Sequence, residues 1–147
     1  MVPGTQFRPV LPDAHPSTDK VERVVLVSGK IYYELAKERA ARGLEGKVAL
    51  IRIEELAPFP FTYLADTLKS YTSASSQPEW WWVQEEPKNQ GAWSHVKDRL
   101  GVVLSGLGER GEVRFIGRRE DAVPATGIGK DYQAQQKAVV EGPFQGL

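Results

Sequence analysis

The sequence WWWVQEEPKNQGAW occupies residues 80–93, and the expected architecture follows from it. Successive side chains of a strand point to opposite faces, so Trp80 and Trp82 would face one side of a sheet and Trp81 and Val83 the other. Because both faces are apolar, both must be covered. This is typical of an interior strand of a parallel sheet with helices on either side.

The polar half of this segment follows the apolar run. Pro87 is expected to end the strand because proline has no N–H to donate to the ladder. The sequence Asn-Gln-Gly at 89–91 predicts a turn, and Trp93 is expected to begin a helix. In open α/β sheets, ligands and partners bind at the carboxyl ends of strands. We therefore expect an interface here, formed by the side chains of Glu85, Glu86, Lys88, Asn89, Gln90 and Trp93.

Composition limits the classes of function. The 147 residues are enough for one domain with a core of its own. The formal net charge is zero, which argues against nucleic acid or an anionic membrane as the main partner. The absence of cysteine excludes disulfides, thiolate zinc sites and cysteine nucleophiles. The sequence has no apolar run of transmembrane length and no signal-peptide pattern, although a targeting peptide could have been removed from a longer precursor.

Apolar runs and helical periodicity divide the rest of the chain. Residues 1–20 contain four prolines and are expected to form an extended N-terminal arm, with a short strand near 7–10. Residues 21–147 are expected to form one α/β domain, a three-layer α/β/α sandwich with a mostly parallel sheet and right-handed crossovers. An antiparallel edge strand is compatible with this plan. Strands are expected near 21–28, 47–53, 80–83 and 113–117, and helices near 30–42, 61–71, 92–104 and 131–141.

The titratable residues do not form a recognisable catalytic group. Glu85 and Glu86 are adjacent on a strand and would point to opposite faces, so both cannot easily reach one substrate. His15 and His95 have no serine or cysteine partner at a recognisable spacing, and no metal-ligand cluster exists. We therefore expect no catalytic residue and no metal site in this chain.

Three arginines give the best candidate for an anion site. Guanidinium groups grip phosphate or carboxylate with two parallel hydrogen bonds. Arg114, Arg118 and Arg119 lie on or just after the strand expected at 113–117. The alternative is that they are solvated residues at a strand end.

Six segments of the chain form an ordered set of motifs: GTQF (4–7), SGKIYY (28–33), RIEELAPFP (52–60), QEEPKNQGAW (84–93), IGR (116–118) and PATG (124–127). In this order they resemble the C-terminal region of the 2-oxoglutarate dehydrogenase family. This family is the thiamine diphosphate-dependent first component of 2-oxoacid dehydrogenase complexes. The sequence GIG at 127–129 resembles the 2-oxoadipate dehydrogenase-like branch more closely, while Tyr132 falls near a position where many relatives carry histidine. Both substrates therefore stay open.

The resemblance implies a fold like the transketolase C-terminal domain, packed at a dimer interface beside cofactor-binding domains. It implies that the full enzyme decarboxylates a 2-oxo acid on thiamine diphosphate with Mg²⁺ and passes the acyl group to the lipoyl arm of a dihydrolipoyl acyltransferase. No Gly-Asp-Gly with a downstream Asn-Asn occurs, so this chain is expected to bind neither cofactor and to be inactive alone. The implied location is the mitochondrial matrix in a eukaryote or the cytoplasm in a bacterium.

The resemblance also bears on regulation. Some bacterial relatives are regulated by acyl-CoA bound on this region, and Arg118 and Arg119 are candidates for that contact by their chemistry. Two alternatives remain. In the first, the chain is a free-standing module that binds an anion such as acyl-CoA, or binds a protein, and has no catalytic activity. In the second, it is an unrelated small α/β enzyme. The last finds no support, because no nucleophile–base pair can be assembled.

Overall fold

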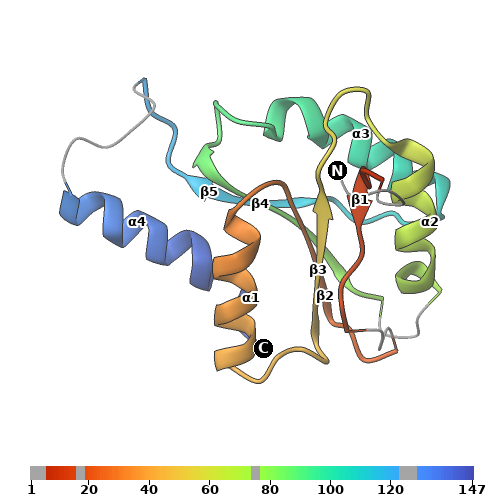
Figure 1. Ribbon diagram of the computed structural model, residues 1–147, viewed down its shortest axis with the longest axis horizontal. Helices are drawn as coiled ribbons and strands as arrows, with labels where there is room; N and C mark the ends of the chain where they lie inside the picture. The colour runs from red at the N-terminus through yellow and green to blue at the C-terminus, as the bar shows by residue number, and fades with distance from the viewer. Residues whose placement is uncertain (1–5, 16–18, 74–76, 123–128) are drawn as a thin grey trace.

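The computed structural model describes residues 6–15, 19–73, 77–122 and 129–147, which form three layers with the sheet in the middle (Figure 1). The strands are β1 (Val10–Leu11), β2 (Arg23–Val27), β3 (Val48–Ile53), β4 (Glu79–Pro87) and β5 (Arg114–Arg118). The helices are α1 (Ile31–Ala41), α2 (Phe61–Thr72), α3 (Trp93–Gly106), α4 (Gly129–Glu141) and the short 3₁₀ helix η1 (Gly142–Phe144).

The sheet has the order β1-β3-β2-β4-β5. Strands β2 to β5 are mutually parallel, and β1 pairs antiparallel with β3 at one edge. This confirms the predicted three-layer sandwich with a mostly parallel sheet. It also places the tryptophan strand β4 in the interior of the sheet, between β2 and β5.

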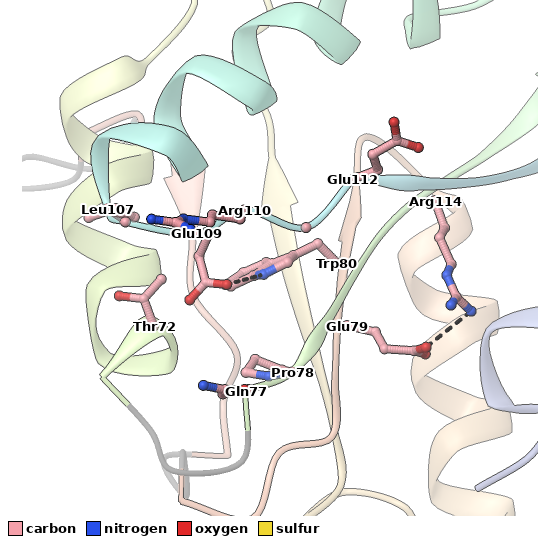
Figure 2. A pocket seen from close by; sticks show the side chains of 12 residues that line it. Thr72, Gln77, Pro78, Glu79, Trp80, Leu107, Glu109, Arg110, Glu112 and Arg114 are labelled. Atoms are coloured by element: carbon pink, nitrogen blue, oxygen red, sulfur yellow. Dashed lines mark hydrogen bonds and ion pairs between the residues drawn. The ribbon is translucent and has the colours of Figure 1, made fainter.

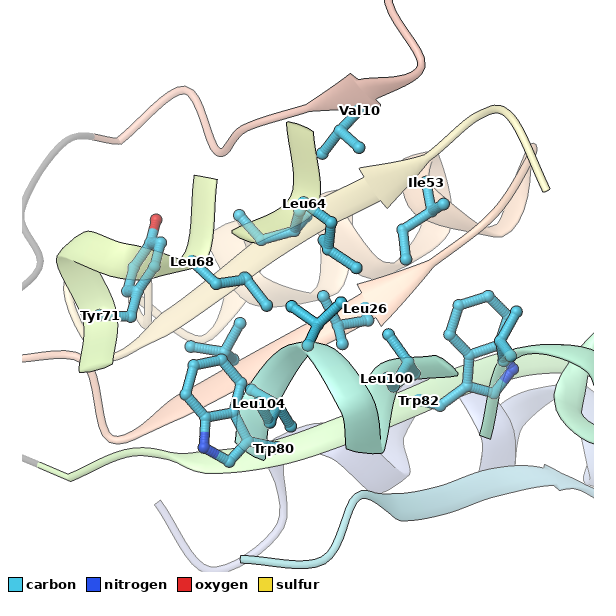
Figure 3. Packing of buried hydrophobic residues seen from close by; sticks show 14 of the residues in the cluster. Val10, Leu26, Ile53, Leu64, Leu68, Tyr71, Trp80, Trp82, Leu100 and Leu104 are labelled. Atoms are coloured by element: carbon cyan, nitrogen blue, oxygen red, sulfur yellow. The ribbon is translucent and has the colours of Figure 1, made fainter. Parts of the chain in front are cut away.

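The alternation of side chains along β4 explains how the two helical layers are held. Trp80 and Trp82 are buried with residues of α2 and α3 on one face, beside Leu26, Leu64 and Leu100 (Figure 3). On the other face, Val83 is buried with residues of α1 and α4, and Trp81 packs against that cluster. The strand continues past its apolar run and ends at Pro87, with an irregular register between Val83 and Pro87 where it pairs with β5.

The N-terminal residues that the structure describes lie against the sheet. Val10 is buried in the core, and the carbonyl of Pro9 accepts a hydrogen bond from the N–H of Glu54 at 2.9 Å. The carboxylate of Asp13 accepts the N–H of Leu50 and pairs with the Arg39 guanidinium. The strand expected near 7–10 therefore lies at Val10–Leu11 and supplies the antiparallel edge of the sheet.

Within the described part of the chain, the helices are too short or too polar to cross a bilayer.

Candidate docking surface at the carboxyl ends of the strands

Residues 84–93, which we call the carboxyl rim, lie at the topological switch point of the sheet. Strands β2 and β4 are neighbours, yet α1 after β2 and α3 after β4 pack on opposite faces. In open parallel sheets, ligands and partners bind outside the carboxyl ends of such a strand pair. Gly29, with φ +78°, makes the tight turn from β2 into α1 at this edge.

Gln84 organises the carboxyl rim from inside, and it is a residue that the sequence analysis passed over. Its side chain follows Trp80 and Trp82 on the same face of β4, and the residue is only 3% exposed. Its Oε1 accepts hydrogen bonds from Trp82 Nε1 and from the Trp93 N–H, both at 3.0 Å. Its Nε2 donates to three backbone carbonyls, those of Pro87 (2.9 Å), Gln90 (2.8 Å) and Glu86 (3.3 Å). The sequence signal for this role is a single polar residue that continues an apolar face.

Gly91 closes the turn against this amide. Its φ is +66°, a conformation that favours glycine. A Cβ at this position would lie 2.9 Å from Glu86 Cβ and 3.0 Å from Gln84 Nε2. The turn is therefore compact, and only glycine fits it without a shift of its neighbours.

Glu85 and Glu86 have different surroundings. Glu85 is partly buried, 3.7 Å from Lys30 Nζ, and its Oε1 accepts a hydrogen bond from Gln136 Nε2 at 3.3 Å. Gln136 also bonds to Glu34 of α1 and accepts from Arg118 Nη2 at 2.8 Å. Glu85 thus takes part in holding α4 against the sheet, whereas the exposed Glu86 lies next to Gly91 on the opposite side.

The other four residues expected at the interface divide into exposed and supporting groups. Lys88 and Asn89 are exposed, and Gln90 is half-buried. Asn89 Nδ2 donates to the carbonyl of Asp121 at 2.9 Å, and Gln90 Nε2 donates to the same carbonyl at 3.2 Å. Trp93 is buried, with its ring 5.1 Å from that of Phe115. The exposed surface of the carboxyl rim is therefore made mainly by Glu86, Lys88 and Asn89.

The structure does not bring the three candidate arginines together. Arg114 lies at the amino end of β5, where its Nη1 is 3.0 Å from Glu79 Oε1. Arg118 and Arg119 lie at the carboxyl end and line a hollow of 650 Å³ between β5 and α4. The Arg118 guanidinium packs 4.4 Å over the Tyr132 ring, and its Nε is buried without a hydrogen-bond partner in the part of the chain that the structure describes.

A second cleft, of 780 Å³, lies at the amino ends of β4 and β5 (Figure 2). The ion pairs at this cleft centre on Glu79, which pairs with Arg114 of the cleft lining and with Arg23. Burial raises the pKa of Glu79, but hydrogen bonds from Trp81 and Arg23 and the charges of Arg23 and Arg114 outweigh it, so the pKa is lowered overall. Trp80 Nε1 donates to Glu109 Oε2 at 3.3 Å across the cleft. This pairing indicates a structural role for these charges.

Among the residues that the structure describes, no three histidine, aspartate or glutamate side chains gather closely enough to hold a metal ion.

Comparison with known proteins identifies related sequences over almost the whole chain. The family model described as 2-oxoglutarate dehydrogenase C-terminal matches residues 1–144. A rat protein named 2-oxoglutarate dehydrogenase-like, mitochondrial, is 38% identical over 130 residues, which are 86% of this chain and 12% of the relative. A Caenorhabditis elegans protein, named a probable 2-oxoadipate dehydrogenase complex component E1 homolog, is 39% identical over 97% of this chain and 15% of its own length. The Rickettsia felis 2-oxoglutarate dehydrogenase E1 component is 38% identical over 94% of this chain and 14% of its own length.

The fold also has a solved counterpart. A split-gene transketolase, described as an inactive beta4 tetramer, superimposes with a TM-score of 0.55 over 97% of this chain and 44% of that chain. Its sequence identity is 16%, so this likeness concerns the fold alone. It agrees with the transketolase-like architecture expected from the sequence.

The chain spans roughly a seventh of the length of the curated relatives it matches, since the matched regions are 12%, 15% and 14% of the three relatives named above.

Proposed function

Because the chain belongs to the 2-oxoglutarate dehydrogenase C-terminal family, we propose that it acts as the C-terminal domain of an E1 component. This component oxidatively decarboxylates 2-oxoglutarate or 2-oxoadipate and acylates the lipoyl group of a dihydrolipoyl acyltransferase. Thiamine diphosphate and Mg²⁺ supply the decarboxylation chemistry when bound elsewhere in the parent enzyme, and this chain supports dimerisation and regulation. The observation that carries the proposal is the family match over residues 1–144, in a chain covering only 12–15% of its relatives.

The carboxyl rim is proposed to dock against the cofactor-binding domains of the same enzyme and the dimer partner. Glu86 and Lys88 are exposed on a turn that is fixed from inside. Exposed aromatic side chains lie at the same edge of the sheet, since Tyr33 (66%) and Phe61 (43%) are in the first turns of the helices that follow β2 and β3. Exposed aromatic residues among charged ones are typical of protein interfaces. The proposed location is the mitochondrial matrix in a eukaryote and the cytoplasm in a bacterium, and the rat relative is itself named as mitochondrial.

A chimera tests this function. The C-terminal region of the Rickettsia felis E1 component is replaced by this chain, and decarboxylation of 2-oxoglutarate and of 2-oxoadipate is measured with thiamine diphosphate and Mg²⁺. The control is the same protein without a C-terminal region. We expect the chimera to dimerise and to turn over at least one substrate, and the isolated chain to turn over neither. A soluble, dimeric chimera no more active than the truncated control would contradict the proposal, as would turnover by the isolated chain.

The hollow beside α4 supports a second candidate function, the binding of an anionic effector such as acyl-CoA. Arg118 and Arg119 line it, and among the described residues the buried Nε of Arg118 has no hydrogen-bond partner. Calorimetry with acetyl-CoA tests this on the isolated chain, with Arg119→Ala as the variant and Arg114→Ala, at the opposite end of β5, as the matched control. We expect Arg119→Ala to weaken binding and Arg114→Ala to leave it unchanged. No heat with the wild-type chain, or equal binding by both variants, would refute it.

A further inference from the structure

A buried primary amide is costly unless its donors and acceptor are all used. Gln84 meets this condition with five contacts, and these contacts fix which end of the amide is nitrogen. Two N–H groups face three carbonyl oxygens, and Oε1 faces two N–H donors. The reversed orientation would set oxygen against oxygen. The side chain is therefore held in a single orientation by its surroundings.

The carboxyl rim has few other internal ties. The Gln90 N–H donates to the Pro87 carbonyl at 2.9 Å, the bond that closes the turn. Helix α3 has no side-chain cap at Ala92, and the Trp93 N–H is one of the donors that find no acceptor within the helix itself. Gln84 Oε1 accepts that N–H, and thus serves the start of α3 from a neighbouring strand. One side chain therefore holds both the turn and the first residue of the helix that follows it.

We propose that Gln84 is the positioning residue of the carboxyl rim. By drawing the carbonyls of residues 86, 87 and 90 inward, it fixes a turn on which Glu86 and Lys88 face solvent. Gln84 itself is buried and touches no partner. The inference rests on the proposed docking function, and adds which residue gives the docking surface its shape.

Hydrogen exchange of backbone amides tests the local part. The variants are Gln84→Met, which keeps the volume and loses all five contacts, and Gln84→Glu, which keeps an acceptor and loses the donors. We expect Gln84→Met to raise exchange at both Gln90 and Trp93 by about tenfold relative to the amides of β2, since each lost hydrogen bond weakens local order. Gln84→Glu should raise exchange at Gln90 and spare Trp93.

Leu100→Ala is the matched control, because it removes a buried side chain of α3 about two helical turns after Trp93. It should lower global stability without a selective effect on residues 86–91. If Gln84→Met and Leu100→Ala give the same pattern of exchange, Gln84 is an ordinary core residue and the inference fails.

Docking completes the test. The chain is titrated into Rickettsia felis E1 lacking its C-terminal region, under conditions in which every variant remains folded. We expect both Gln84 variants to bind about tenfold more weakly than the wild type, because the net free energy of one hydrogen bond corresponds to about that change in affinity. We expect Leu100→Ala to bind normally. Normal docking by Gln84→Met with a loosened turn would overturn the inference and leave the proposed function intact. Failure of the wild-type chain to dock would instead count against the proposed function.

Discussion

Asp13 and Arg39 form a buried ion pair that fastens the N-terminal residues to the sheet. Their side chains are 1% and 3% exposed. Arg39 Nη1 also donates to the Val48 carbonyl at 2.8 Å, and the Asp13 carboxylate accepts the Leu50 N–H next to it. Taking charges out of water is expensive, so such a pair adds little net stability while intact, but the loss of one partner is severe.

Asp13→Ala should therefore leave the Arg39 charge buried without a partner and lower the free energy of unfolding by about 3–5 kcal/mol. Urea denaturation measures this. The control Glu38→Ala breaks the Glu38–Arg42 pair, whose side chains are 27% and 34% exposed, and should cost about 0.5 kcal/mol. The double variant Asp13→Leu/Arg39→Leu should recover much of the loss. If Asp13→Ala lowers the free energy of unfolding no more than Glu38→Ala does, the Asp13–Arg39 pair does not hold the N-terminal residues to the sheet.

Tyr71 lies near this pair and its hydroxyl titrates late. Burial and the negative charge of Asp13 raise its pKa from 10.0 to about 12, against a smaller opposing effect of Arg39. Tyrosine is neutral below its pKa, and the folded value is above the unfolded one. Its contribution to stability is therefore complete below pH 10 and is lost as the pH rises from about 10 to 12.

An ultraviolet titration of tyrosinate should show one step near pH 12 that is absent in Tyr71→Phe. Tyr63→Phe, which changes a tyrosine that is 64% exposed, should keep that step. If the spectrum lost by Tyr71→Phe appears near pH 10 in the folded protein, the hydroxyl is not shielded as the structure indicates.

At the scale of elements, β4 and β5 are tightly packed where their register is irregular. A Cβ on Gly117 would lie 2.8 Å from the backbone oxygen of Glu86 and would also meet the Phe115 ring. This close approach brings Arg118 beside Gln136 of α4, and so links the carboxyl rim to the C-terminal helix. The absence of a side chain at residue 117 is thus a packing requirement.

Gly117→Ala should lower the free energy of unfolding by about 1–3 kcal/mol, because the backbone of β4 cannot yield as a flexible side chain would. Gly101→Ala is the matched control. Gly101 lies within α3 with open space around it, and alanine there should raise stability by about 1 kcal/mol. Opposite signs in thermal or urea denaturation are the expected result. A neutral Gly117→Ala would mean that the two strands are further apart at this point.

The elements that the sequence predicted well are those with a local signal. The apolar run at 80–83 and the three- and four-residue spacing of apolar side chains in the helices indicate which residues are buried in the core. The order of the strands depends on long-range pairing, which periodicity does not contain. Gln84 was missed because its role depends on carbonyls up to six residues away.

The arginine cluster illustrates a different gap. Arg114 and Arg118 are close in sequence, but four residues along a strand span about 13 Å, which places them at opposite ends of β5. Strand geometry could have separated them in advance. The pairing of Arg114 with Glu79, by contrast, required knowing that β4 and β5 are neighbours.

At the scale of the whole molecule, the two ends of the sheet differ. At the amino ends, charges such as Glu79, Arg23 and Arg114 are paired with each other around a cleft. At the carboxyl ends, the exposed Glu86 and Lys88 lie at the topological switch point on a turn held from inside, and the exposed Tyr33 and Phe61 begin helices at the same edge of the sheet. We therefore expect docking at the carboxyl ends of the strands and not at the amino ends, and this difference can be measured.

The most direct measurement is the affinity of this chain for Rickettsia felis E1 lacking its C-terminal region, compared between two charge reversals. Glu86→Lys changes the exposed carboxyl rim, and Arg110→Glu changes an exposed residue of the cleft at the opposite end. We expect the wild-type chain to bind, Glu86→Lys to weaken binding by about tenfold, and Arg110→Glu to have no effect. If Arg110→Glu weakens binding and Glu86→Lys binds normally, the docking surface lies at the amino ends of the strands, which contradicts the proposed docking at the carboxyl rim.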